Sequence, residues 1–154
     1  MEAHNPFSHI IVPTDGSETS ITAGKLAIEI AAVHRIKITF VYVIDSNIAE
    51  GVAGATTKTL DMACEELGQN ASRYLDYLSR LASNYSLIPN QVVRIGTPYV
   101  EITELARELH ADLIVIGRTS GTGTQRLARI GSVAERVIEY AHCPVLTVRH
   151  RPAY

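Results

Sequence analysis

Short apolar runs alternate with amphipathic segments along this 154-residue chain, and no other feature of the sequence restricts its fold as strongly. The runs are rich in valine and isoleucine and are bounded by glycine, proline or polar residues. Continuous apolar runs of this length are typical of strands that are buried on both faces of a sheet. The runs predicted to be strands are Ile10–Val12, Ile36–Ile44, Gln91–Ile95, Leu113–Ile116 and Val145–Val148.

Most segments between these runs carry apolar residues at the spacing of an amphipathic helix. The segment Ser46–Thr59 differs, because it contains Gly51, Gly54 and many small residues, and we expect it to be a mobile loop over one rim of the fold. The predicted helices are one that ends near His34, Leu60–Ser83, one that contains Ile102 to Leu109, and Val133–Ala141.

Strands that alternate with helices predict an α/β fold in which helices cover both faces of an open parallel sheet. The length suits a single domain, residues 1–154. Ligands of such sheets bind at the carboxyl ends of the strands, where the strand order reverses. Asp15, Asp45 and Gly117 each follow a predicted strand, so we expect them to converge on one crevice.

The stretch Leu113–Val148 passes from a predicted strand through a loop rich in glycine, serine and threonine into a predicted helix. Ser132 and Glu135 have the spacing of a capping box, which places the start of this helix. Free backbone N–H groups and the positive end of the helix dipole favour an anionic group such as phosphate there. A flexible loop whose helix is capped only by Ser132 fits the same residues, so this stretch leaves both interpretations open.

The bulk composition argues against several classes of partner. The net charge of −2 at pH 7 gives no sign of the basic face that nucleic-acid and acidic-membrane binders carry. No apolar run approaches the roughly 20 residues of a transmembrane helix, and Met1–Phe7 lacks the apolar core of a signal peptide. Cys64 and Cys143 form no CxxC or zinc pattern, and the histidines show no metal-ligand spacing. We therefore expect a cytoplasmic protein without a dedicated metal site.

Two motifs in this order resemble the universal stress protein family, and the resemblance covers Phe7–His150. The first is IIVPTDGSETS, which begins at Ile10 and is similar to the family's opening strand, Pro-x-Asp turn and serine. The second is the family's glycine signature, a Gly, two residues, a Gly, nine residues and then Gly-Ser or Gly-Thr. Nine residues separate Gly121 from Gly131-Ser132, as in that signature.

The first half of the signature departs from the family pattern. Three residues, rather than two, separate Gly117 from Gly121. Either Ser120 takes the place of the second glycine, or the loop holds one extra residue and Gly121 takes that place. A serine hydroxyl can face a phosphate, but its Cβ limits the approach of the backbone.

The resemblance implies a Rossmann-like fold of the adenine nucleotide alpha hydrolase-like type, an open five-stranded parallel sheet of order 3-2-1-4-5 with four helices. It implies ATP as the ligand, with AMP or ADP fitting the same pocket and any Mg²⁺ arriving with the nucleotide. The implied contacts are Pro13 and Asp15 beside the adenine and ribose, Val43 against the adenine, Gly117 beside the ribose, and Gly121, Gly131, Ser132 and Val133 around the phosphates, with Thr14, Ile116 and Ser120 completing the set.

Asp15 also has a structural interpretation. It precedes the first predicted helix and is one of the residue types that cap helices. Ser17 and Ser20 are available for the same role. The residues alone therefore allow Asp15 to be a ligand contact or a helix cap.

Rapid catalysis has little support in the sequence. The chain lacks the Walker motif Gly-x-x-x-x-Gly-Lys-Ser/Thr, and with it the lysine that stabilises a transferring phosphate. We expect a nucleotide-dependent switch or sensor in a stress response, with slow or no hydrolysis and an unidentified protein partner. The resemblance also implies a homodimer through the edge strand Val145–Val148. The alternatives are a homodimeric interaction module of the same family that binds no nucleotide, and an enzyme that uses ATP.

Overall fold

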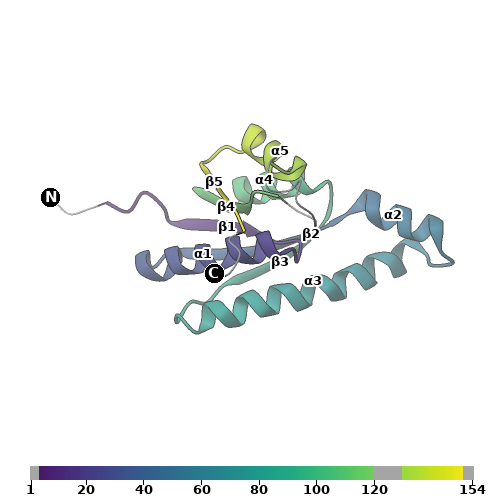
Figure 1. Cartoon of the computed structure of the whole chain (residues 1–154), viewed down its shortest axis with the longest axis horizontal. Coiled ribbons are helices and arrows are strands. Elements are labelled where there is room, and N and C mark those ends of the chain that lie inside the picture. The colour runs from purple at the N-terminus through teal and green to yellow at the C-terminus, as the bar shows by residue number, and fades with distance from the viewer. Residues whose placement is uncertain (1–3, 120–129, 151–154) are drawn as a thin grey trace.

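The computed structural model describes residues 4–119 and 130–150 and shows a parallel sheet covered by helices on both faces (Figure 1). The strands are β1 (His9–Pro13), β2 (Lys37–Asp45), β3 (Asn90–Gly96), β4 (Leu113–Gly117) and β5 (Val145–Val148). The helices are α1 (Glu18–His34), α2 (Ser46–Ala55), α3 (Leu60–Ser83), α4 (Pro98–Glu108) and α5 (Ser132–Tyr140). The five strands lie in the order β3-β2-β1-β4-β5, which confirms the predicted sheet and its order.

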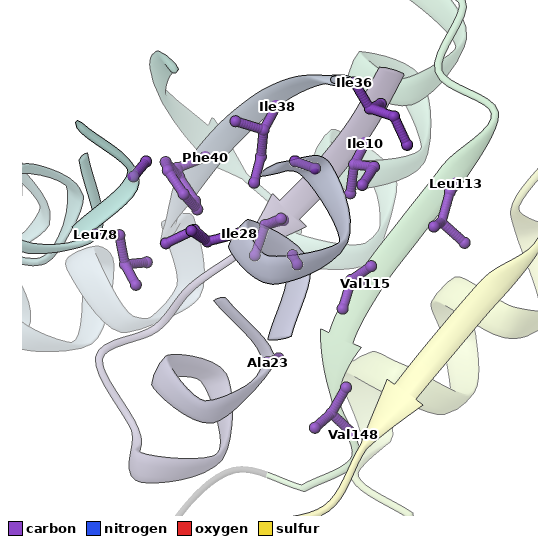
Figure 2. Packing of buried hydrophobic residues seen from close by; sticks show 14 of the residues in the cluster. Ile10, Ala23, Ile28, Ile36, Ile38, Phe40, Leu78, Leu113, Val115 and Val148 are labelled. Carbon is purple, nitrogen blue, oxygen red and sulfur yellow. The ribbon is translucent and has the colours of Figure 1, made fainter. Parts of the chain in front are cut away.

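Successive residues of the central strands belong to opposite sides of the sheet, as the pleat of a strand requires. On β1, Ile10 and Val12 pack with α1 and α3, whereas Ile11 packs with α4 and α5. Figure 2 shows the first of these two clusters, which includes Ile28 of α1 and Phe40 of β2. The strands are continuously apolar because both of their faces are buried.

The strand order reverses beside β1. From β1 the chain moves outward through β2 to β3, and it then returns to the other side of β1 to form β4 and β5. The pairs are parallel and in register, with Pro13 opposite Val41 and Ile11 opposite Ile114. The carboxyl ends of β1, β2 and β4 therefore meet at one rim, which is the topological switch point of the sheet.

The prediction of a mobile loop at Ser46–Thr59 is wrong, and with it the number of helices, because α2 occupies most of this segment. The side chain of Asp45 caps α2 by accepting a hydrogen bond of 2.9 Å from the backbone N–H of Asn47. Ala49 of α2 and Ala63 of α3 are fully buried, and the two helices pack on each other. Tertiary packing thus stabilises a helix despite its glycines. In Figure 1, α2 and the beginning of α3 project beyond the sheet.

Among residues 4–119 and 130–150, no helix is both long enough and apolar enough to cross a membrane, and this includes the 24-residue α3. The apolar residues of α3 instead form one stripe, of which Leu75 and Leu78 lie in the core.

A histidine is buried at the opposite end of β1 from the switch point. The ring Nε2 of His9 lies 2.7 Å from Thr39 Oγ1, and both residues are buried. Burial lowers the pKa of His9 below the ordinary value of 6.5. A hydrogen bond to the backbone of Leu109 has the opposite effect and raises the pKa, but it does not offset the burial. Lys37 lowers the pKa further and Asp112 raises it. The folded state therefore favours the neutral ring.

This burial predicts an acid-sensitive contribution to stability. Because the pKa of His9 is lower in the folded than in the unfolded chain, its contribution is complete above pH 6.5 and is lost as the pH falls below that value. We expect the free energy of unfolding, measured by urea denaturation between pH 7.5 and 5, to fall less steeply in His9→Gln than in the wild type. Equal slopes would contradict this assignment.

The glycines of α2 give a second prediction. A Cβ added at Gly51 or Gly54 would meet no atom within 4 Å, so neither glycine is required by packing. Alanine should raise the free energy of unfolding by about 0.5–1 kcal/mol at each position, because glycine is the poorer helix former. Gly24→Ala in α1 is the matched control, since its Cβ would lie 2.7 Å from Cδ2 of the buried Leu78 and should bring no gain. Urea denaturation of the three variants tests this; a loss at both α2 positions would contradict it.

Candidate functional site

A cavity of about 390 Å³ opens at the rim where β1, β2 and β4 end. Its volume is in the range of small-molecule pockets, and its position is the one that open α/β sheets use for ligands. Its walls come from segments far apart in the sequence: Pro13, Thr14, Asp15, Ser17, Ser20, Val41 to Asp45, Ile48, Leu67, Pro98, Ile102, Ile116 to Thr119, Gly131, Val133 and Ala134.

One wall of the cavity is apolar. It is formed by three residues that also pack in the cluster on the α4 and α5 side of the sheet: Val43 of β2, Ile102 of α4 and Ile116 of β4. Ile48 of α2 and Leu67 of α3 close the cavity from the projecting helices. A flat apolar ring can be buried against such a surface, since apolar contact is the main source of affinity in small-molecule pockets.

The turn between β1 and α1 forms the polar part of the cavity. Its backbone leaves the sheet after Thr14, whose N–H donates to the carbonyl of Val41 at 2.9 Å. Asp15 is exposed, and its Oδ1 accepts a hydrogen bond of 2.9 Å from the N–H of Ser17. Ser17, not Asp15, is the N-cap of α1, because its side chain accepts from the N–H of Ser20. Asp15 therefore shapes the turn and still has lone pairs for a ligand.

The N-terminus of α5 faces the same cavity. The N-cap is Gly131, so the predicted cap at Ser132 and its capping box with Glu135 are wrong. Ser132 is instead the first helical residue, and no side chain of the described residues caps this helix. The first N–H groups of a helix have no partner within the helix, and they lie at the positive end of its dipole. Gly131 and Val133 line the cavity, so the start of α5 lies at its edge.

Gly117 has a structural reason to be glycine. A Cβ at this position would lie 2.9 Å from the backbone carbon of Thr19 and 3.0 Å from the backbone nitrogen of Ser20. The end of β4 therefore packs directly on the first turn of α1, and only glycine permits this approach without displacement of the backbone. This packing would require glycine at 117 even if no ligand were bound.

Most of the predicted site residues meet at the cavity. Ser132 is not among its lining residues, and Ser120 and Gly121 lie outside the described residues. The predicted residues that line it are Pro13, Thr14, Asp15, Val43, Ile116, Gly117, Gly131 and Val133. The sequence prediction does not include Ile48, because it treats Ser46–Thr59 as a loop although Asp45 is a possible helix cap. It does not include Leu67, because it assigns the apolar stripe of the predicted helix Leu60–Ser83 to the core.

Two further properties of the described part of the chain bear on its chemistry. Burial raises the pKa of Tyr42, a lining residue, and the charge of Asp15 and the neighbouring Tyr74 raise it further. The Tyr42 hydroxyl is therefore neutral at physiological pH. Among residues 4–119 and 130–150, no group of three or more histidine, cysteine, aspartate or glutamate side chains could hold a metal ion.

The contact between Gly117 and α1 gives a prediction for stability. Gly117→Ala should lower the free energy of unfolding by about 1–3 kcal/mol, the usual cost of overpacking, because two backbone atoms must move. Gly68→Ala is the control, since its Cβ would lie 3.8 Å from Ile44 Cδ1, an ordinary contact. Urea denaturation without any ligand measures both. If Gly117→Ala were as stable as the wild type, the packing role would be excluded.

The comparisons with known proteins agree with this geometry. The sequence model of the universal stress protein family matches residues 6–149. Universal stress protein MJ0531 of Methanocaldococcus jannaschii is 38% identical over 146 residues, which cover 94% of this chain and 84% of the relative.

Solved structures of the same family share the fold. Protein MJ0577 of Methanocaldococcus jannaschii superposes with a TM-score of 0.81 at 23% identity, covering 97% of this chain and 100% of its own. The universal stress protein from Archaeoglobus fulgidus in complex with dAMP has a TM-score of 0.66 at 20% identity, covering 94% of this chain and 99% of its own. Since the family model spans almost all of the sequence and the sheet has the same architecture, this chain belongs to the universal stress protein family.

Proposed function

We propose that the cavity binds an adenine nucleotide, ATP or its products ADP and AMP, and that its occupancy acts as a switch in a stress response. The observation that carries the proposal is the meeting of three features at one cavity. These are an apolar wall, the exposed carboxylate of Asp15 and the N-terminus of α5. An adenine, a ribose and a phosphate chain need these three environments in this order. The complex of the Archaeoglobus fulgidus protein with dAMP supports the same class of ligand.

The end of β2 offers the adenine a pair of backbone hydrogen bonds. The carbonyl of Val41 accepts from Thr14, so it points toward β1. Residues two apart on a strand direct their backbone groups to the same side, and Val43 therefore points its N–H and C=O beyond the last β1 pair. One donor beside one acceptor matches N1 and the amino group of adenine, whereas guanine presents the reverse pair. The pocket should therefore prefer adenine.

The ribose and phosphates would extend from this point along the rim. Asp15 accepts hydrogen bonds from ribose hydroxyls, with Pro13, Thr14, Ile116 and Gly117 around the sugar and base. The backbone N–H groups of Ser132 and Val133 at the start of α5 bind the phosphates. Gly131 lies beside them at the cavity, and its own N–H donates to the carbonyl of Arg118 at 2.7 Å. Ser120 and Gly121 complete this part of the proposal, although they lie outside the described residues.

The proposed role is binding rather than turnover. Mg²⁺ would arrive with the phosphates and keep most of its waters, because the described residues provide no cluster of metal ligands. The absence of the Walker lysine from the sequence fits slow hydrolysis or none. A cytoplasmic location fits this ligand, since ATP and its products are abundant there.

A second copy of the chain is the partner expected at β5. This four-residue strand lies at one edge of the sheet, and Leu146 on it is 38% exposed. Edge strands are normally covered or paired, and pairing with the same strand of a second copy would do this. A further protein partner would then respond to the nucleotide state of the dimer.

The proposed site predicts how nucleotides change the melting temperature. ATP with Mg²⁺ at 100 times its dissociation constant should add ~2.7 kcal/mol to the free energy of unfolding, and GTP should add little. Asp15→Ala and Gly131→Val should each weaken ATP binding at least tenfold, equivalent to ~1.4 kcal/mol, by loss of the ribose acceptor and by crowding of the phosphates. Isothermal titration calorimetry measures the affinities.

Glu29→Ala is the matched control for these variants, because Glu29 is an exposed acidic residue of α1 far along the helix from the cavity. Unchanged affinity in both site variants would exclude the proposed site. No binding of any nucleotide by the wild type, once freed of copurifying ligand, would instead favour the interaction module that binds no nucleotide. The irregular spacing of Gly117 and Gly121 favours the same alternative.

A further inference from the structure

We propose that Tyr74 of α3 is a positioning residue for nucleotide binding, because its ring holds the Asp15 turn in the shape that the ligand needs. Tyr74 itself is not a lining residue of the cavity, so it would act through the backbone of this turn and through Tyr42. The inference rests on the proposed function and adds to it the element that keeps the site preorganised.

The first observation is the contact between Tyr74 and Gly16. The backbone of Gly16 has φ 83°, a left-handed conformation that other residues rarely adopt. A Cβ added there would lie 2.3 Å from Cε2 and 2.4 Å from Cζ of the Tyr74 ring. The ring therefore occupies the space that any other side chain at position 16 would need. The ring of Tyr74 therefore packs directly on the backbone of the turn at Gly16.

The second observation is the pairing of Tyr74 with Tyr42. The two rings are nearly parallel, at an interplanar angle of 4°, and their centroids are 6.4 Å apart. Tyr42 lines the cavity, and the charge of Asp15 acts on its hydroxyl. Offset parallel rings attract each other beyond the effect of their buried area. The two tyrosines thus connect α3, the Asp15 turn and the cavity wall.

The third observation is the source of rigidity. The start of the turn is anchored at Thr14, which is bonded to the carbonyl of Val41 and, through its hydroxyl, to Ser20 at 3.0 Å. At Asp15 and Gly16 the hydrogen bonds are local, from the N–H of Ser17 to Asp15 Oδ1 and from the N–H of Gly16 to the hydroxyl of Thr14 at 3.3 Å, so the ring of Tyr74 supplies the contact with a distant segment at this point. Tyr74 comes from a helix whose neighbouring residues Leu75 and Leu78 are buried in the core. The ring is therefore a fixed support that the rest of the fold provides for the turn.

The expected consequence follows from population arithmetic. The apparent dissociation constant equals the intrinsic constant divided by the fraction of molecules whose turn has the binding shape. If loss of the ring reduces this fraction to about a tenth, affinity falls about tenfold, equivalent to ~1.4 kcal/mol. The intrinsic contacts of the ligand are unchanged, because Tyr74 makes none of them.

The experiment compares ATP affinity, measured by isothermal titration calorimetry well below the melting temperature, in three variants of the full chain. Tyr74→Leu should bind about tenfold more weakly than the wild type, and Tyr74→Phe, which keeps the ring, should restore the affinity. Tyr77→Leu is the matched control, since Tyr77 lies on the same helix and is 36% exposed. A role confined to folding would lower the melting temperature of Tyr74→Leu without changing its affinity, and that result would overturn the proposal.

A fluorescence measurement gives an independent readout. The chain contains no tryptophan, so Tyr74→Trp introduces a single reporter beside the turn. Its emission should change saturably with ATP, at a midpoint equal to the calorimetric constant, whereas Tyr77→Trp should not respond. A silent reporter at position 74 in a variant that still binds ATP would overturn the proposal. If neither the wild type nor any variant binds ATP, the proposed function is overturned. If the wild type and Tyr74→Leu bind ATP equally strongly, only this inference is overturned.

Discussion

The parallel pairing of β1 with β2 on one side and β4 on the other is the constraint on which the rest of this structure depends. Parallel neighbours require crossover helices, and these helices bury both faces of the sheet. The same pairing brings three carboxyl ends to one rim, where the backbone of each strand leaves the sheet in a different direction. The cavity lies at this rim, between helix α1, which packs on one face of the sheet, and helix α5, which packs on the other. The position of the site is thus a consequence of the strand order of the sheet.

The features that the sequence predicts well are those in which one pattern repeats over many residues. Both faces of Ile10–Val12 and Leu113–Ile116 are covered, and continuous apolar runs indicate this directly. The strand order follows from the resemblance to a family rather than from periodicity, because every open order of parallel strands satisfies the same pattern. The sequence predicts that Asp15 and Gly117 lie at one rim, because residues that follow parallel strands must lie there.

The features that the sequence does not predict depend on contacts between distant segments. The helix α2 contains two glycines and little apolar periodicity. It is stabilised by its packing on α3, which buries Ala49, and by the cap at Asp45. The sequence pattern places the cap of α5 at Ser132, one residue after the observed cap, because Gly131 and Ser132 are both acceptable N-caps. The contact of Tyr74 with Gly16 links α3 to the first turn of the chain, and no local pattern marks it.

Gly16 and Gly117 show that a glycine in this fold can be required by packing as well as by a ligand. Gly16 is required by its left-handed backbone and by the ring of Tyr74, and Gly117 is required by the backbone of α1. Both requirements hold without a ligand, so glycine at these two positions does not by itself indicate a nucleotide site. The nucleotide binding proposed above would depend instead on backbone groups at the rim that make no backbone hydrogen bond within the described part of the fold. Within residues 4–119 and 130–150, the backbone N–H and C=O of Val43 and the N–H groups of Ser132 and Val133 have no backbone partner at this rim.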